Sequence, residues 1–589
     1  MSRRRSVLLG GLALALVASL TACGSAMPDS GVAGAGRPIG EGSSREPLQI
    51  APVGPRPDAG PAEIVGGFLK AGAGFDGDHA VARTFLDGEA RAAWRPAQGT
   101  IVYPDDPSLT VVSHGSGVNR EVVVSAPVYG TIDADGRFAP AKPGTTARTT
   151  FQVRRLGQVW RIETLSAQFG LWMPRYEFQR SYTPLRISFV ATGTRQLVSD
   201  QRWFAGSRAS LATAAVRALL AGPPAYLKDA VTTGFPTGTT LGVDAVPTSG
   251  GTAQIDLSTR ALAASPDQRQ QLWSQLFATL HQLPTVNDIE VTAGGGAFQV
   301  PGVGAGGSDA DLGFRDNVQV AGPVLVLSGG RLKTLDAAGA LSPQISGRFA
   351  GRLDVSGLRS IAAGPHDDAV VGVDGSGTRL LSIAAQSAPE ELGRGGDLVP
   401  PVIDRSGWAW TADRAAAGRM LVAPATSSGA AASQSPDSSV RMEPRWLTGR
   451  TVIALDVARD GSRVAVVSAA ADGSTRLDVA GVVRGDSGRP TSLAQPWQVG
   501  QSLASVSDVS WADRTTLVVL GGQSGQRQPY QVEVGGEVSA LPKLPSAVGV
   551  MAGSGVSSVY LTLANGHVVV RAGSGWRDLG AATSVTIPS

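Results

Sequence analysis

Hydrophobic and polar positions follow several successive patterns along this chain, and each pattern predicts a different kind of structure. An uncharged run rich in Leu, Ala and Val occupies residues 6–22. Between residues 24 and 60, Gly, Pro, Ser and charged residues follow one another without periodicity, which is typical of a flexible tether. From Pro61 onward hydrophobic residues recur at helical and strand spacings, and from about Asn317 they gather in short strand-like blocks. The pattern predicts a leader, a tether and several folded domains.

Residues 61–182 are predicted to form a small α+β domain. One helix opens at Pro61 and a second is expected from Asp78 to Leu86, continuing irregularly to Trp94. Half-buried strands are expected at 109–112, 121–129 and 149–163, with a turn at 133–136 joining the last two. Helices followed by a curved antiparallel sheet resemble the cone-shaped fold of the nuclear-transport-factor-2 kind. Asp133 and Asp135 fit a hairpin turn better than a calcium loop, which needs more oxygen ligands.

Residues 183–302 show a second α+β pattern. A helix is expected at 210–220, followed by Ala-Gly-Pro-Pro at 221–224, a strand at 242–246 and a helix at 266–283. With the segment Ile-Asp-Leu-Ser at 255–258 and a strand at 288–292, this order resembles the GerM domain of spore-germination proteins and envelope lipoproteins. The resemblance implies a binding module without catalysis.

Residues 303–316 are predicted to be a linker. The glycines from Gly302 to Gly307 match the spacing of a dinucleotide-binding loop, but Pro301 precedes them and no helical periodicity follows. A cofactor is therefore not expected here.

Residues 317–589 are predicted to form an all-β propeller of about six or seven blades. Hydrophobic blocks begin near residues 324, 360, 401, 454, 508 and 550. A repeat of about 40 to 55 residues with Gly-rich turns is the spacing of propeller blades. An array of stacked sheets is the alternative.

The first 23 residues predict where the mature chain resides. Three arginines precede the apolar run, which closes on Leu20-Thr-Ala-Cys23, and Cys23 is the only cysteine. This arrangement predicts a signal peptide over residues 1–22. Its end resembles the bacterial lipobox, in which the cysteine receives diacylglycerol and N-acyl groups, leaving residues 23–60 as a lipidated tether. An uncleaved membrane anchor and an ordinary core cysteine are the alternatives, but the run is short for a span and contains Gly10 and Gly11.

Composition narrows the classes of function. Removing residues 1–22 leaves equal numbers of basic and acidic side chains, 48 of each, and no long basic run, so a nucleic-acid role is not expected. The abundance of Ala, Gly, Arg and Val is typical of a GC-rich, actinobacterial genome.

No residue pattern indicates catalysis, a metal site or a cofactor. The five histidines (His79, His114, His281, His366 and His567) occur without metal-binding spacing. The segment His366-Asp-Asp368 fits a solvated turn better than a cation site. We therefore expect a protein that is not an enzyme, with no catalytic, cofactor-binding or metal-binding residues and with Cys23 as its one site of covalent chemistry.

The full order of lipobox, tether, small α+β domain, GerM-like domain and propeller resembles the actinobacterial lipoprotein family LpqB. The resemblance implies a lipid-anchored protein on the extracytoplasmic face of the cell membrane. It further implies contact with the extracellular domain of the sensor kinase MtrB and modulation of the MtrA/MtrB two-component system, affecting cell-wall homeostasis and division. The alternative is an envelope enzyme or a glycan- or ligand-binding receptor that uses the propeller channel. Carboxylates or aromatic rings converging in that channel would favour the alternative.

Cys23→Ser is expected to abolish lipid attachment, because the thiol is the acyl acceptor, and to leave a soluble chain or an unprocessed precursor. Metabolic labelling with a fatty-acid analogue, followed by membrane fractionation, measures both effects. Normal lipid labelling of the variant would contradict the assignment.

Overall fold

The computed structural model describes residues 52–588 apart from 76–77, 106–107, 305, 317–319, 321, 336–338, 343–354, 365–369, 384–387, 426–438 and 524. All described residues belong to one compact unit, residues 51–589. The leader, Cys23, most of the tether and His366–Asp368 lie outside the described residues.

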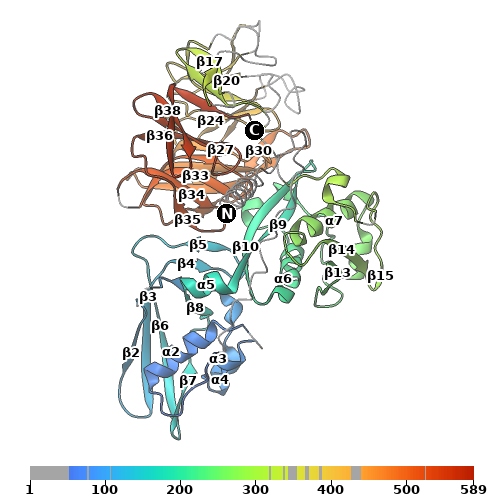
Figure 1. Ribbon diagram of the computed structural model, residues 1–589, viewed down its shortest axis with the longest axis vertical. Helices are drawn as coiled ribbons and strands as arrows, with labels where there is room; N and C mark the ends of the chain where they lie inside the picture. The colour runs from blue at the N-terminus through green and yellow to red at the C-terminus, as the bar shows by residue number, and fades with distance from the viewer. Residues whose placement is uncertain are drawn as a thin grey trace, which may run out of the picture. The chain divides into compact units, whose positions relative to one another are not determined.

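The N-terminal domain combines short helices with two four-stranded sheets (Figure 1). Its helices are α2 (Pro61–Gly72), α3 (Ala80–Arg83), α4 (Gly88–Ala93), the 3-10 turn η1 (Pro96–Gln98) and α5 (Arg175–Ser181). One sheet has the order β5-β4-β1-β8, with β1 (Thr100–Tyr103), β4 (Gly130–Ile132), β5 (Phe138–Pro140) and β8 (Leu171–Pro174). The other has the order β2-β3-β6-β7, with β2 (Thr110–His114), β3 (Asn119–Pro127), β6 (Thr146–Leu156) and β7 (Val159–Thr164).

The first predicted helix is present, and its apolar face forms the domain core. Proline occupies the first turn of α2, and the carboxylate of Glu63 accepts the N–H of Gly60 at 2.8 Å. Phe68 packs edge-on against Trp94 and Phe151, with ring centroids 5.0 and 6.0 Å away. Such aromatic contacts supplement the apolar burial that stabilises this domain.

Two details of the N-terminal domain differ from the expectation. The second helix starts only at Ala80, because Asp78 and His79 have positive φ angles of 54° and 58°. It ends at Arg83, and Leu86 then bridges to β7. The turn at 133–136 joins β4 to β5, two strands that the sequence pattern did not reveal. There the carboxylate of Asp133 accepts the N–H groups of Asp135 and Arg137 at 3.0 and 2.9 Å, as in a hairpin turn.

The second domain begins with the long antiparallel hairpin of β9 (Tyr182–Ala191) and β10 (Leu197–Ala205), to which β11 (Val231–Thr232) adds. A second sheet has the order β12-β13-β14-β15, with β12 (Thr248–Ser249), β13 (Thr252–Leu257), β14 (Asp288–Ala293) and β15 (Gly296–Ala297). The helical elements are α6 (Arg208–Leu220), η2 (Ala225–Leu227), η3 (Thr259–Ala263), α7 (Pro266–Leu280) and η4 (Asp309–Leu312).

Helix α7 connects the parallel strands β13 and β14 and begins where the sequence predicts. Ser265 accepts the N–H of Gln268 at 3.2 Å, and the Gln268 side chain accepts the N–H of Ser265 at 2.9 Å. The helix ends at Leu280, three residues before the expected end. The strand expected at 242–246 is not formed: this stretch is irregular, and its Val243 is exposed.

The C-terminal region is built from six antiparallel sheets within the described residues. The first two sheets are β16 (Leu325–Ser328), β17 (Arg331–Leu335) and β18 (Leu341–Ser342) with β40 (Ser584–Thr586), and then β19 (Leu358–Ala363), β20 (Val370–Asp374), β21 (Arg379–Ile383) and β22 (Glu390–Arg394). The third and fourth are β23 (Val402–Ile403), β24 (Trp408–Ala412), β25 (Met420–Pro424) and β26 (Val440–Met442), and then β27 (Thr451–Val457), β28 (Arg463–Ala469), β29 (Thr475–Arg484), β30 (Pro490–Leu493) and β31 (Trp497–Val499). The fifth and sixth are β32 (Ser505–Trp511), β33 (Thr516–Gly522), β34 (Gln528–Glu533) and β35 (Val538–Ala540), and then β36 (Ala547–Ala552), β37 (Val559–Leu563), β38 (His567–Ala572) and β39 (Gly575–Ala581). A further 3-10 turn, η8 (Arg445–Leu447), precedes β27.

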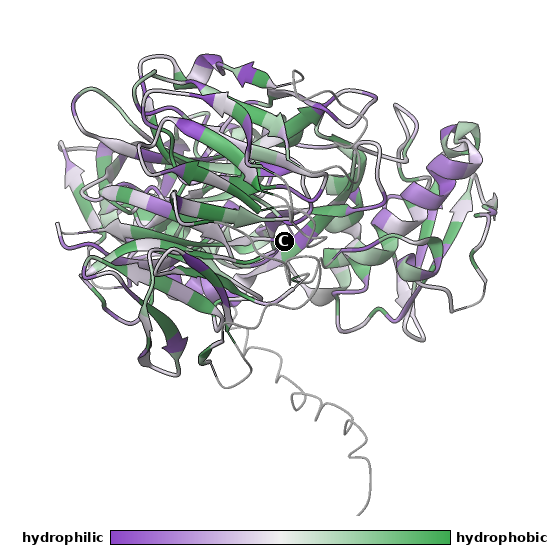
Figure 2. Ribbon diagram, turned by 90° about the horizontal axis from the view of Figure 1, so that it is seen from above, coloured by the Kyte–Doolittle hydropathy of each residue, from purple (hydrophilic) through white to green (hydrophobic). Residues whose placement is uncertain are grey.

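These sheets form the predicted β-propeller. The inner strands contact one another in succession around the ring, in the order β40, β19, β23, β27, β32 and β36. Strand β40 pairs with β16 and so belongs to the first sheet. The middle strands β24, β25 and β33 are buried along their whole length, because neighbouring blades cover both faces of each sheet. Figure 2 shows hydrophobic residues concentrated along the propeller strands. This burial explains the continuous apolar runs in the sequence.

The second domain and the propeller share one hydrophobic core. Buried residues from β9, α6, α7, β28 and β33 belong to the same cluster. Gly481 on β29 lies directly against η2, and the rings of Tyr226 and Trp497 contact each other at a tilt, with centroids 5.1 Å apart. The fully buried Arg463 pairs with Asp460 and donates to the Ser199 carbonyl on β10 at 3.1 Å. A shared core of this kind joins the two domains as one body.

The N-terminal domain meets this body at Trp203 on β10. The Trp203 ring lies 4.7 Å from Phe178, its backbone N–H donates to Gly136, and its indole N–H donates to the Gly535 carbonyl at 2.7 Å. Close by, Arg175 pairs with Glu537 at 3.0 Å. One residue of the second domain thus contacts both of the others.

Gly481→Ala is expected to lower the free energy of unfolding by about 1 to 3 kcal/mol, the usual effect of overpacking. A Cβ atom there would lie 2.7 Å from the Ala230 side chain and 2.9 Å from the Tyr226 carbonyl. Gly485→Ala is the control on the same blade, because its nearest neighbour, Thr491, would be 3.6 Å away. Urea unfolding followed by tryptophan fluorescence measures the difference, and equal midpoints for both variants would contradict tight docking.

Candidate functional site

The inner strands of the propeller surround a cavity of about 350 Å³. Its walls are mainly apolar and include Pro400, Pro401 and Val548 at the mouth. Its charged groups come from different blades: Arg359 from β19, Arg414 from the turn after β24, Asp456 from β27 and Asp508 from β32. Charged groups from four blades therefore converge on one hollow.

The floor of the cavity holds two carboxyl groups, Asp456 and Asp508. Asp456 accepts the Trp511 backbone N–H at 2.7 Å and the Ser510 hydroxyl at 3.0 Å. Asp508 accepts the Val550 N–H at 2.7 Å and the N–H of the next residue in the chain at 2.9 Å. Each carboxylate thus links its own inner strand to the next one around the ring.

Burial determines the ionisation of these two groups. It raises the pKa of Asp456 to about 6 and that of Asp508 to about 7, although the hydrogen bonds from backbone N–H groups act in the opposite direction. The charge of Asp456 further raises the pKa of Asp508. Both groups consequently titrate near neutral pH.

Hydroxyl groups make similar links between other inner strands. Ser584 and Thr586 on β40 accept the N–H groups of Ile361 and Ala363 at 3.3 and 3.2 Å, and Ser510 accepts the N–H of Ala552 at 3.0 Å. Short polar side chains at alternate positions of an inner strand therefore satisfy the backbone of the next blade. Sequence reasoning missed them, although an Asp or Ser inside an otherwise apolar strand is a usable signal.

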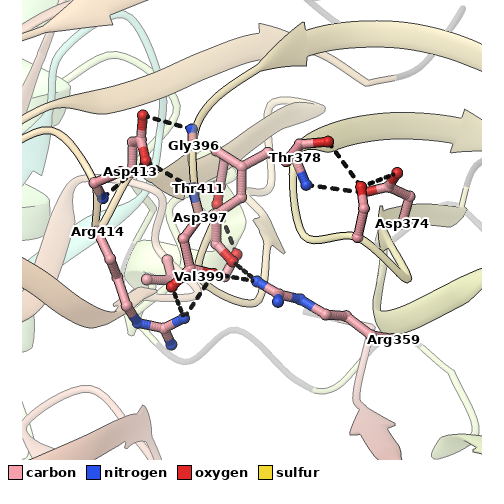
Figure 3. A network of polar contacts seen from close by, with 12 residues as sticks. Arg359, Asp374, Thr378, Gly396, Asp397, Val399, Thr411, Asp413 and Arg414 are labelled. Carbon is pink, nitrogen blue, oxygen red and sulfur yellow. Dashed lines mark hydrogen bonds and ion pairs between the residues drawn. The ribbon is translucent and has the colours of Figure 1, made fainter.

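At the mouth, two arginines share one carboxylate (Figure 3). Arg359 Nη2 lies 2.9 Å from Asp397 Oδ1, and Arg414 Nη1 lies 3.4 Å from Asp397 Oδ2. Arg359 also donates to the Leu398 carbonyl and Arg414 to the Ile453 carbonyl at 3.4 Å. The hydrogen bond from Arg359, with the charge of Arg414, lowers the pKa of Asp397.

The loop that carries Asp397 is held by Asp413. The carboxylate of Asp413 accepts the N–H groups of Gly396, Asp397 and Ala415, each at 3.0 Å (Figure 3). Although burial opposes it, these bonds lower the pKa of Asp413. A charged acceptor with three backbone donors fixes the loop, and with it the position of the carboxylate between the two arginines.

The opposite end of the channel is closed. Arg459 donates to the carbonyl oxygens of Trp511, Ala512, Ala552 and Gly553 at 2.8 to 3.2 Å. Above it only about 20 Å³ of space remains between the inner strands. The cavity is therefore blind and opens at one mouth.

The histidines of the described region lie apart from this cavity and from one another. His79 packs against Trp94, with burial lowering its pKa; His281 stacks on Phe277; and His567 contacts Asp578 at 2.8 Å. Over the described ranges, no group of three or more His, Cys, Asp or Glu side chains could hold a metal ion. Within the same ranges, no helix combines the length and apolar composition needed to cross a membrane.

Three family models match successive parts of the chain. The Lipoprotein LpqB N-terminal domain matches residues 54–179, the sporulation and spore germination domain matches 187–297, and the Lipoprotein LpqB beta-propeller domain matches 338–589. Together with the fold, these matches define a multi-domain lipoprotein with a GerM-like domain and a C-terminal β-propeller.

Curated relatives extend the match over most of the chain. A Lipoprotein LpqB of Thermobifida fusca is 30% identical over 533 residues, which cover 83% of each chain. One of Streptomyces coelicolor is 28% identical over 642 residues, covering 100% of this chain and 98% of its own. One of Streptomyces avermitilis is 28% identical over 580 residues, covering 93% and 92%. The chain belongs to the lipoprotein LpqB family, as its domain order predicts.

The raised pKa values of Asp456 and Asp508 predict that acid stabilises the propeller. A carboxyl group whose pKa is higher in the folded chain stabilises fully below its unfolded value, near 3.8, and loses that contribution as pH rises through about 6 and 7. Asp508→Asn, which stays neutral, is expected to unfold at a temperature that falls less between pH 5 and pH 8 than that of the wild type.

Differential scanning calorimetry across that pH range measures the effect. Asp486→Asn, at an exposed turn of the same propeller, is the control and should follow the wild-type profile. Parallel profiles for Asp508→Asn and the wild type would show that Asp508 does not titrate in this range.

Proposed function

We propose that this chain is anchored through lipidated Cys23 to the extracytoplasmic face of the cell membrane and binds the extracellular domain of the sensor kinase MtrB. Through that contact it modulates the MtrA/MtrB two-component system and so affects cell-wall homeostasis and cell division. The observation that carries the proposal is the match to the LpqB family across all three domains.

The domain contacts support a role in which the three domains are presented to a partner together. The second domain and the propeller share a core, and Trp203 joins the N-terminal domain to both. A partner that holds one domain therefore fixes the orientation of the other two.

We also infer that the role is binding and not catalysis. The carboxyl groups of Asp456 and Asp508 accept hydrogen bonds from backbone N–H groups of the next inner strand, so they stabilise the ring. Within the described part of the chain, no histidine lines the cavity to serve as a base for a nucleophile.

Crosslinking in intact membranes tests the partner. Val118 of the N-terminal domain and Val243 of the second domain are both 61% exposed and suit a photo-crosslinking amino acid, because neither change disturbs a core. We expect an adduct with MtrB from at least one position, and its loss in the Cys23→Ser background. The position that forms the adduct also indicates whether the N-terminal or the second domain faces the kinase.

A pull-down from detergent-solubilised membranes provides an independent measurement, with another membrane kinase as the specificity control. If correctly localised protein recovers no MtrB by either method, the proposed partner is wrong.

A further inference from the structure

The blind cavity has the properties of a ligand site, and this inference goes beyond the kinase partnership. Its volume of about 350 Å³ is within the range of roughly 300 to 1,000 Å³ of small-molecule pockets. Apolar walls surround a few polar groups brought in from separate blades, as described above. Because Arg459 plugs the far end, a ligand enters and leaves through one mouth.

The charges at the mouth favour an anionic group. Arg359 and Arg414 contribute two positive charges, and within the described residues Asp397 is the one carboxylate paired with either. The side chains of Arg359 and Arg414 remain 36% and 34% exposed, so part of each guanidinium group can donate hydrogen bonds to a ligand at the opening. Guanidinium groups bind carboxylates and phosphates through paired hydrogen bonds.

The floor favours hydroxyl groups. Asp456 and Asp508 lie deep within the propeller but remain partly accessible through the cavity. An ionised carboxylate accepts hydrogen bonds from hydroxyl groups, and a protonated one can also donate a hydrogen bond, so both states can bind a polyhydroxylated body. Beside the cavity, Ser360 is 6% exposed and its hydroxyl has no hydrogen-bond partner among the described residues. A buried hydroxyl without a partner is unfavourable unless a ligand satisfies it.

The apolar rim completes the arrangement. Val548, on β36, is 44% exposed and lines the cavity, and Pro400 and Pro401, which precede β23, line it from another blade. Such side chains can cover the C–H face of a ring while the polar groups bind its hydroxyls. We propose that the propeller cavity binds a monosaccharide-sized sugar acid, with its acidic group at Arg359 and Arg414 and its hydroxyls toward Asp456, Asp508 and Ser360.

Calorimetric titration of the full-length protein in detergent tests the proposal with D-glucuronate, D-galacturonate and D-gluconate as probes. D-Glucose, which lacks the acidic group, and acetate, which lacks the hydroxylated body, are the matched controls. We expect saturable binding of at least one sugar acid and a response at least about tenfold weaker to glucose and acetate, the usual effect of losing a charge-assisted contact.

Two variants separate binding from folding. Arg359→Gln should weaken sugar-acid binding about tenfold or more, whereas Arg394→Gln, whose arginine pairs with Glu391 outside the cavity, should leave it unchanged. Ser360→Ala removes a buried hydroxyl that makes no hydrogen bond, so its unfolding temperature without ligand should equal or exceed that of the wild type, while its binding weakens a few-fold.

Absence of saturable binding by all three acids, equal binding of glucose, or undiminished binding by Arg359→Gln would each overturn the proposal. None of these outcomes bears on MtrB, because crosslinking to the kinase uses positions outside the cavity. Failure of the kinase experiment would likewise leave the sugar-acid measurement intact.

Discussion

The hydrophobic core shared by the GerM-like domain and the propeller is the interaction on which the rest of this structure depends. It extends from helix α7 through the hairpin of β9 and β10 into the blades of β28 and β33. The buried guanidinium of Arg463, which is paired with Asp460 and bonded to β10, lies in the same contact. Burying a paired charge in an interdomain contact restricts the geometry in which the domains can meet, since a shifted arrangement would leave that charge uncompensated.

The inner ring of the propeller meets a different physical requirement. Inner strands of adjacent blades converge without forming one continuous sheet, so their backbone groups need other partners. Side chains of Asp456, Asp508 and Ser510, with Ser584 and Thr586, supply acceptors for the neighbouring strand. The same carboxyls line the cavity, so one set of residues both holds the ring together and gives the hollow its chemistry.

The sequence predicted the class of each domain because periodicity records burial. Helices α2 and α7 and the apolar blocks of the propeller follow directly from it. It could not reveal that β40 belongs to the first blade, since that pairing joins residues more than two hundred positions apart. For the same reason the convergence of Arg359, Arg414, Asp456 and Asp508 was not predictable: each lies on a separate blade, and only the closed ring brings them together. Cys23, the one predicted site, lies outside the described residues.

The pairing of β40 with β16 also sets an order of events during synthesis. Residues 325–342 cannot complete their sheet until Ser584–Thr586 have also been made. Until then the first blade lacks its inner strand, and β19 lacks the hydroxyl acceptors that Ser584 and Thr586 provide. Long-range closure of this kind slows folding, because loop entropy is lost before the contacts form. The nascent chain therefore presents an unfinished sheet edge from the synthesis of residue 328 until that of residue 584, a period in which protection from aggregation matters.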